Sequence, residues 1–145
     1  MDKFLNQLKI AFASQYAFAI KAQNFHWNVE GIDFYQKHKM FQKIYEETYG
    51  AVDDFAENIR KIKAYTPASL YRFSALSAVD DEVEILDPQA MVAELLRDAE
   101  KMQEIMKVLF TEAENLGHHG LSNFLADRQD AFAKHAWFLR STLKD

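Results

Sequence analysis

With 145 residues and 49% apolar side chains, the chain is long enough to bury the core of one soluble domain, residues 1–145. Its 22 acidic and 17 basic residues give a formal net charge of −5, which argues against binding nucleic acid over the whole surface. The absence of cysteine excludes disulfides and thiolate metal sites and fits a reducing, cytoplasmic setting. We expect neither a signal peptide nor a membrane span, since no apolar run approaches ~20 residues.

Apolar side chains recur at helical spacing in four long segments, and few glycines or prolines interrupt them. The periodicity predicts helices over residues 3–29, 33–63, 88–116 and 121–143, with a short helix over residues 69–76. This order predicts an all-α four-helix bundle with one long crossover connection that carries the short helix. The predicted core positions are Phe4, Leu8, Ala11, Phe12, Gln15, Ala19, Ala22, Phe25, Phe41, Ile44, Thr48, Val52, Phe55, Ile59, Ile62, Met91, Leu95, Met102, Ile105, Met106, Leu109, Leu125, Phe132, Trp137 and Leu139.

The predicted helix ends carry the expected residue types, glycine at the stops and a polar cap at the starts. The stops are Gly31 and Gly117, with Gly120 as a further interruption, and the starts are Asp33 with Gln36, Thr66-Pro67 and Asp87-Pro88.

Two histidines and two carboxylates lie in one stretch, and their spacing sets a geometric problem. His38 and Asp53 are fifteen residues apart, or about 22 Å along one helix axis, so one chain cannot place both in a single site. His26 ends one helix and His38 begins the next, so a hairpin can bring the two imidazoles close. Asp53 and Glu57 are one turn apart and lie off the core stripe on a helical wheel, so they can offer oxygens to one ion.

Each group also has a simpler interpretation, and from the residues alone both remain open. Asp53 and Glu57 fit a solvated helix face, with Arg60 and Lys61 as ion-pair partners of Glu57. The histidines fit a helix end and a surface position. The alternative is that two chains meet across a two-fold axis and join the four groups into a site for iron, zinc or manganese. The sequence contains no Glu-x-x-His, so a di-iron site inside one bundle is not expected.

The remaining candidates carry weaker signals. Trp27 either packs against the fold or donates electrons to a nearby redox metal. His118 and His119 lie between two glycines in a solvated loop or channel mouth, without a nearby carboxylate partner in sequence. His135 is expected to be structural. Asp127 and Asp130 are expected to be exposed, at most near an entry pore.

One segment carries a family resemblance. Residues 24–34 read NFHWNVEGIDF, His38 follows His26 by twelve residues, and residues 53–57 read DDFAE. This combination closely resembles the Dps family of mini-ferritins, which are ferritin-like proteins. The resemblance extends over essentially the whole chain, including the short helix and the ending at residues 134–140.

The resemblance implies a ferroxidase. It implies a hollow homododecamer whose centres lie at two-fold interfaces, with His26 and His38 from one subunit and Asp53 and Glu57 from its neighbour. Trp27 matches a tryptophan beside the centre. The implied reaction oxidises Fe(II), with hydrogen peroxide preferred over oxygen, and stores ferric mineral in the cavity, which protects against oxidative stress.

Four departures from the family pattern leave alternatives open. Gln42 stands where many members carry an Asp that supports a second iron, and Lys39 stands where Glu is common. The 118–123 stretch lacks the acids that often line the pore, and no Lys/Arg-rich tail favours DNA binding. The alternatives are therefore a shell that coats DNA, or a structural shell whose centre is weak or holds zinc.

Overall fold

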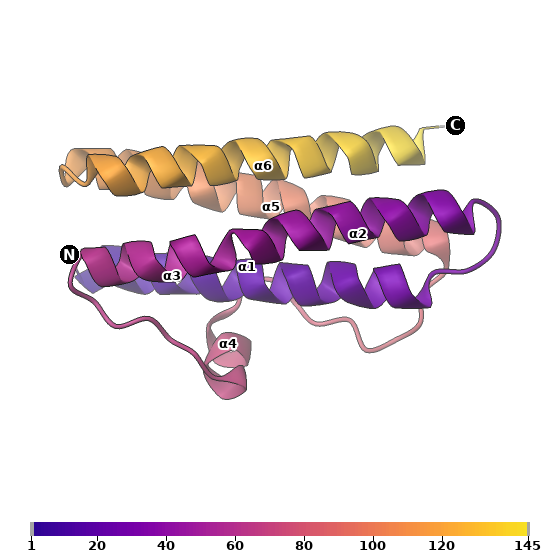
Figure 1. Cartoon of the computed structure of the whole chain (residues 1–145), viewed down its shortest axis with the longest axis horizontal. Coiled ribbons are helices and arrows are strands. Elements are labelled where there is room, and N and C mark those ends of the chain that lie inside the picture. Colours follow the sequence, from indigo (N-terminus) through magenta and orange to yellow (C-terminus); the bar gives the residue numbers. More distant parts are fainter. Residues whose placement is uncertain (1, 145) are drawn as a thin grey trace.

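The computed structural model describes residues 2–144 as six helices, and these described residues include no strand (Figure 1). The all-α architecture and the short helix in the crossover are as predicted. The helices are α1 (Asp2–Asn28), α2 (Phe34–Gly50), α3 (Val52–Lys61), α4 (Leu70–Leu76), α5 (Pro88–Asn115) and α6 (His119–Leu143).

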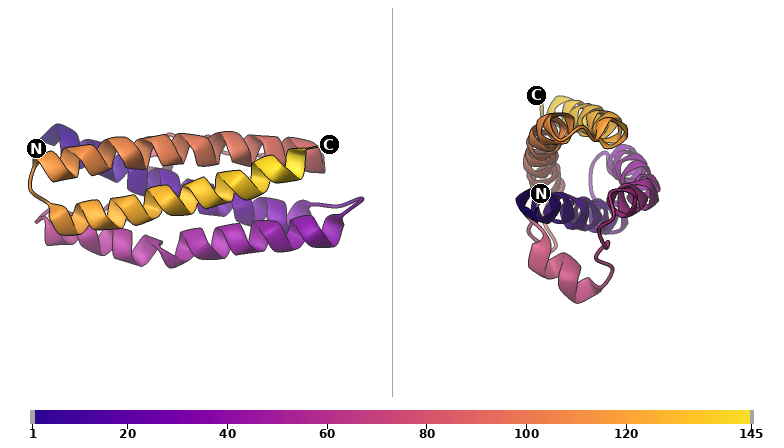
Figure 2. Two further views of the ribbon diagram at one scale, coloured as in Figure 1. Left: turned by 90° about the horizontal axis from the view of Figure 1, so that it is seen from above. Right: turned by 90° about the vertical axis from the view of Figure 1, so that its left-hand side faces the viewer.

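Four helical columns surround one core. Helix α1 runs antiparallel to α2, and α3 continues α2 in the same direction, so these two helices form a single column (Figure 1). The crossover then passes along the outside of the bundle to the start of α5, and α6 returns antiparallel to α5. In the end-on view α4 lies outside the ring of long helices (Figure 2). No helix among residues 2–144 has the length and apolarity needed to cross a membrane.

The predicted single helix over residues 33–63 is interrupted at Ala51. The backbone N–H of Ala51 bonds to the Thr48 carbonyl, three residues back, at 3.3 Å, as in a turn. The four-residue spacing of an α-helix resumes with Phe55 N–H to Ala51 O at 3.2 Å. Gly50 precedes the break, and glycine is the ordinary residue that most weakens a helix interior. The interruption leaves the direction of the column unchanged.

Of the three predicted helix starts, one is confirmed and two are wrong. Asp87 is confirmed as the cap of α5, because its side chain accepts from Ala90 N–H at 2.9 Å and Pro88 follows. The capping box of Asp33 is wrong, because Asp33 has a φ of 62° and its side chain makes no capping bond. Ser69, and not Thr66, caps α4, and the Thr66 hydroxyl donates instead to Ala56 O at 2.7 Å.

Helix α6 also begins earlier than predicted. Its first residue is His119, so Gly120 lies in its first turn and does not interrupt the chain. The stop at Gly117 is confirmed, since this residue has a φ of 79° and lies between α5 and α6.

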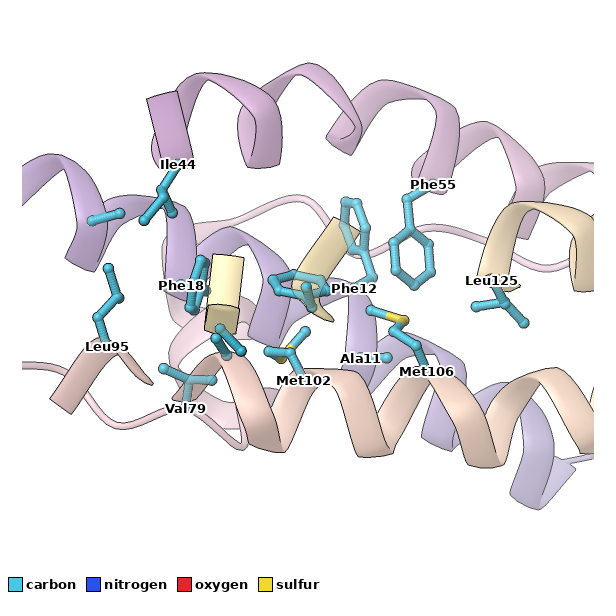
Figure 3. Packing of buried hydrophobic residues seen from close by; sticks show 14 of the residues in the cluster. Ala11, Phe12, Phe18, Ile44, Phe55, Val79, Leu95, Met102, Met106 and Leu125 are labelled. Atoms are coloured by element: carbon cyan, nitrogen blue, oxygen red, sulfur yellow. The ribbon is translucent and has the colours of Figure 1, made fainter. Parts of the chain in front are cut away.

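The core is aliphatic and aromatic along its whole length, and nearly all predicted positions face it (Figure 3). Phe12 packs edge-on against Phe55 at 5.5 Å between ring centroids, and this contact joins α1 to α3. Trp137 was predicted to be inside but is 55% exposed. Val52, Ile62 and Ile105 pack against the core only partly buried.

Two buried basic side chains form hydrogen-bonded ion pairs between different helices. Lys21 of α1 donates to Asp98 of α5 at 2.7 Å and lies 3.2 Å from Glu94. Arg128 of α6 reaches Gln15 of α1 and both carboxylate oxygens of Glu47 on α2. Each buried charge is therefore paired, as a buried charge must be to avoid a large desolvation cost.

Candidate metal centre

His26 and His38 lock one another in place, and we call them the histidine pair. His26 Nδ1 lies 2.7 Å from the His38 carbonyl oxygen, and His38 Nδ1 lies 2.7 Å from the His26 carbonyl oxygen. A carbonyl only accepts, so both Nδ1 atoms carry the hydrogen and donate it. In the neutral rings both Nε2 atoms then keep a lone pair, which is the form of imidazole that binds a metal.

The chain reversal between α1 and α2 produces this arrangement. Gly31 has a φ of 105°, and Phe34 N–H bonds back to Gly31 O at 3.1 Å. The two imidazoles stack with centroids 3.9 Å apart and planes at 17°, between Phe34 on one side and Tyr45 on the other. The prediction that a hairpin brings the two rings close is confirmed.

Three carboxylates gather on α3, and we call Asp53, Asp54 and Glu57 the acidic cluster. Each offers an oxygen, these oxygens lie within 4.8 Å of one another, and all three residues are exposed. Asp53 and Asp54 occupy the first turn of α3, where the helix dipole favours negative charge. Asp54 was not among the predicted ligands, although three acids within residues 53–57 were a visible signal for it.

The predicted ion pairs of Glu57 are absent from residues 2–144. Arg60 instead donates to Ala64 O at 3.1 Å and lies over the Tyr65 ring at 4.8 Å. Neither Arg60 nor Lys61 pairs with Glu57 among the described ion pairs, so no basic side chain neutralises the acidic cluster in this way.

One chain does not bring the histidine pair and the acidic cluster together. The histidine pair lies where α1 ends and α2 begins, whereas the acidic cluster lies on α3 of the next column, with His38 and Asp53 fifteen residues or about 22 Å apart. Each chain therefore carries two separate groups of side chains of the types that bind metals.

The residues around the histidine pair differ in accessibility. Trp27 is 67% exposed, so the first of its two expected roles, packing against the fold of its own chain, is wrong. Gln42 donates its amide to Glu46 at 2.7 Å. Lys39 is exposed and lies 5.6 Å above the Tyr35 ring. The face of α2 beside His38 thus presents an amide and an ammonium group.

The other histidines have specific partners. His119 donates from Nδ1 to Glu114 at 2.6 Å, and Ser122 donates to the same oxygen at 3.0 Å, so the expectation of no carboxylate partner is wrong. The bonds from His119 and then Ser122 lower the pKa of Glu114. His118 is half-buried and stacks on Phe4 with centroids 6.3 Å apart.

His135 is buried against Glu47 at 2.8 Å and is structural, as predicted. Asp127 and Asp130 are exposed, also as predicted.

The fold and these residues define a class of helical bundle with an imidazole pair at the turn between α1 and α2 and an exposed carboxylate cluster on α3. A family model described as a ferritin-like domain matches residues 5–145. The DNA protection during starvation protein of Helicobacter pylori is 30% identical over 125 residues, which cover 86% of this chain and 87% of that protein.

Solved structures give the same result. Antigen TpF1 from Treponema pallidum superposes with a TM-score of 0.94 at 28% identity, over 99% of this chain and 93% of that one. Dps from Staphylococcus aureus superposes with a TM-score of 0.94 at 25% identity, over 100% and 97%. This chain therefore belongs to the ferritin-like family and, within it, to the Dps proteins, as the sequence resemblance predicted.

Proposed function

We propose that this protein is a cytoplasmic ferroxidase and iron store. It oxidises Fe(II) with hydrogen peroxide or oxygen at centres shared between two subunits. It keeps the ferric product inside a hollow dodecameric shell and so protects against oxidative damage. The observation that carries the proposal is the mutual locking of the histidine pair, which leaves both Nε2 atoms free.

The locking prepares the histidine pair for a metal. A ligating histidine usually donates its other ring N–H to a carbonyl or carboxylate, which fixes the tautomer and the ring direction. Both His26 and His38 already have that second bond, and packing between Phe34 and Tyr45 restrains their rotation. The two imidazole rings therefore lose little further rotational freedom when Fe(II) binds.

The oxygen ligands of the proposed centre come from the acidic cluster of a second subunit. When two α2–α3 columns pack antiparallel across a two-fold axis, the start of one column lies against the middle of the other. The histidine pair of one subunit then faces the acidic cluster of its partner. A two-fold contact occurs twice, so each dimer has two centres. Asp53 and Glu57 are the proposed ligands, with Glu57 able to bridge two ions, and Asp54 adds negative charge beside them.

The chemistry of these groups suits iron as a substrate. Mixed imidazole and carboxylate sets bind Fe(II), and the hard carboxylate oxygens favour the Fe(III) product. The subunits hold the ligands and leave coordination positions open to the oxidant. Trp27, exposed and next to His26 in the chain, is a proposed electron donor to the centre. Zinc fits the same ligands and is expected to inhibit by occupying them.

The test removes each half of the centre separately. His26→Ala with His38→Ala should abolish fast Fe(II) oxidation by stoichiometric peroxide, followed anaerobically by ultraviolet absorbance. Glu57→Ala should do the same. His119→Ala is the matched control, since it removes an exposed imidazole that also has a carboxylate partner, and it should oxidise iron at the wild-type rate.

Mixed shells decide whether the centres are shared. Refolding the histidine variant with Glu57→Ala should restore part of the activity, because some interfaces then combine an intact histidine pair with an intact acidic cluster. Wild-type rates in the histidine variant would refute the site. Complete inactivity of the mixed shells, with their mass unchanged, would refute the sharing.

DNA coating is the second candidate function, because the name of the Helicobacter pylori relative refers to DNA protection. The net charge of −5 opposes it, since such binding depends on neutralising phosphates. We expect no retarded DNA in a gel at moderate salt. Retardation that persists as salt is raised would favour coating as a function.

A further inference from the structure

The acidic cluster carries three carboxylates, and no basic side chain balances them among residues 2–144. Asp53, Asp54 and Glu57 are all exposed, and none of them takes part in an ion pair within this part of the chain. The proposed centre uses Asp53 and Glu57 as ligands, which leaves Asp54 with a negative charge and no assigned partner. A positive group from the partner subunit would stabilise this arrangement.

Lys39 carries a positive charge beside the histidine pair. It follows His38 directly, is exposed, and makes no ion pair among residues 2–144. Its ammonium group lies 5.6 Å from the centroid of the Tyr35 ring, and Tyr35 is itself 64% exposed. A cation–π contact at such an exposed position is weak. The long, flexible Lys39 side chain can therefore exchange this contact for a carboxylate.

The antiparallel packing of two α2–α3 columns determines which residues lie at the same level. When the histidine pair faces the acidic cluster of the partner, His38 lies level with position 55, the middle of that cluster. One step toward the C-terminus in one column corresponds to one step toward the N-terminus in the other. Lys39 therefore lies level with Asp54 of the partner subunit.

These two residues also lie on the same side of the interface. Lys39 is one residue beyond His38, and Asp54 is one residue beyond Asp53, so each lies about 100° further round its helix. The two-fold axis is perpendicular to the plane of the two columns, so it does not exchange the two sides of that plane. The same rotation therefore brings both residues to the same side.

Among the three lysines of α2, only Lys39 meets a carboxylate at its own level. Lys37 and Lys43 lie level with Ala56 and Gly50 of the partner subunit. We infer that Lys39 pairs with Asp54 of the partner subunit, and that this fixed positive charge limits each shared centre to one metal ion. The inference rests on the proposed function, because the pair forms only where two columns share a centre.

Charge balance explains the limit. One divalent ion and one ammonium group carry three positive charges, which equals the number of carboxylates in the acidic cluster. A second divalent ion would leave two positive charges in excess at close range. No carboxylate one turn beyond His38 offsets them, because that position is Gln42, whose amide donates to Glu46. Glu57 can bridge two ions, so charge, and not the reach of the ligands, sets the number.

Metal counting tests the limit without redox chemistry. The probe is Co(II), titrated anaerobically into the assembled protein and followed by its visible absorption. Binding that disappears when His26→Ala and His38→Ala are added to the same background is binding at the centre. We expect one Co(II) per subunit in wild type and two in Lys39→Asp, which replaces the ammonium group with a carboxylate. The mass of each assembly is checked first.

Two further variants separate the ion pair from a general effect of charge. Lys43→Asp makes the same change one turn farther from His38 and should still bind one Co(II) per subunit. Lys39→Asp combined with Asp54→Lys exchanges the two charges and should return the number to one. One Co(II) in Lys39→Asp alone, two in Lys43→Asp, or two in the exchanged variant would each overturn the inference.

Cross-linking tests the contact directly, because the chain contains no cysteine of its own. Positions 39 and 54 are fifteen residues or about 22 Å apart in one chain, so a short bis-maleimide can join them only between subunits. Lys39→Cys with Asp54→Cys should give covalent dimers. His38→Cys with Glu57→Cys is the reference for the shared centre itself. Dimers from the reference pair alone overturn the inference while the shared centre stands, and no dimers from either pair overturn both.

Discussion

Glu47 is the carboxylate on which two buried groups of α6 depend. It accepts from both terminal nitrogens of Arg128 and from His135 Nε2 at 2.8 Å. Partial burial acts to raise its pKa, but the bonds from His135 and Arg128 outweigh burial and lower the pKa from 4.5 to about 2. Folding therefore stabilises the deprotonated form of Glu47 relative to its protonated form.

This pKa shift predicts a pH-dependent effect of Glu47→Gln. The folded pKa is below the unfolded value, so the stabilisation by the carboxylate is fully present above pH 4.5 and is lost as pH falls through 2. Near neutral pH we expect the variant to lose about 1–2 kcal/mol of unfolding free energy. This is the usual contribution of a hydrogen bond to a charged group, reduced because Glu47 is partly exposed. The difference should shrink steadily below pH 4.5.

Denaturant unfolding at fixed protein concentration and a series of pH values measures this difference. Glu46→Gln is the control, because Glu46 is exposed and, within residues 2–144, its side chain accepts only from the Gln42 amide. A loss for Glu47→Gln that stays constant down to the folded pKa would mean that the shape of the side chain, and not its charge, is what matters.

At the residue scale, the sequence predicts which face of a helix a side chain occupies better than it predicts which distant residue that side chain contacts. The wheel placed Asp53 and Glu57 off the core, and both are exposed. Trp137 was assigned to the core on apolarity alone, although it is about 140° around the helix from Phe132 at about 100° per residue. The bond between His135 and Glu47 joins residues 88 positions apart, and no local pattern reports such a contact.

Helix ends depend on backbone dihedral angles that residue type only partly determines. Gly117 has a φ of 79°, and its turn closes α5 with Gly117 N–H to Glu114 O and His118 N–H to Ala113 O at 3.0 and 2.9 Å. These bonds satisfy two carbonyls of the last turn of α5, as in a Schellman motif. The short connection to α6, and with it the position of His119, depends on this turn.

Two glycines of this connection give a matched pair of substitutions. Gly117→Ala should cost about 1 kcal/mol, because the left-handed conformation disfavours a Cβ. Gly120→Ala should be neutral or stabilise by up to about 1 kcal/mol, because Gly120 lies in the first turn of α6 with ordinary φ. A Cβ meets nothing within 4 Å at either site, so the two changes differ in backbone conformation and not in steric overlap.

Thermal or denaturant unfolding of the two variants checks this prediction. Equal effects at both positions would show that the positive φ does not control stability there.

At the element scale, the sequence predicted the stops at Gly31 and Gly117 because each stands where an apolar period ends. The break beside Gly50 was not predictable in the same way, because glycine inside a periodic pattern is often tolerated in a continuous helix. Asp33 has the right residue type for a cap, but its backbone is left-handed, with a φ of 62°, and its side chain makes no capping bond. Type and spacing therefore located the elements, whereas dihedral angles decided their exact ends.

At the scale of the whole molecule, the histidine pair lies where α1 meets α2, and the acidic cluster lies farther along the column that α2 and α3 form. If a metal ion uses both, it is bound by two chains and not by one. Binding of the ion and association of the chains are then linked, and each must strengthen the other by the same factor. This linkage could be anticipated from the fifteen-residue spacing alone, whereas the locked tautomers of the histidine pair required the structure.

Zinc measures this linkage without redox chemistry, because it binds imidazole and carboxylate but does not change oxidation state. We expect added Zn(II) to move subunit association to lower protein concentration, and a chelator to reverse the shift. An ion at about 100 times its dissociation constant stabilises the state that binds it by about 2.7 kcal/mol per site. Mass measured across a dilution series reports the shift.

The variants locate the effect. His26→Ala with His38→Ala should show no zinc-dependent shift, and neither should Glu57→Ala, because each lacks one half of every centre. A mixture of the two should show a partial shift, since one of the two centres in a mixed dimer is complete. If zinc instead raised thermal stability without changing association at any concentration, the ion would be held within one chain. The histidine pair and the acidic cluster would then be separate sites, and a shared ferroxidase centre would be excluded.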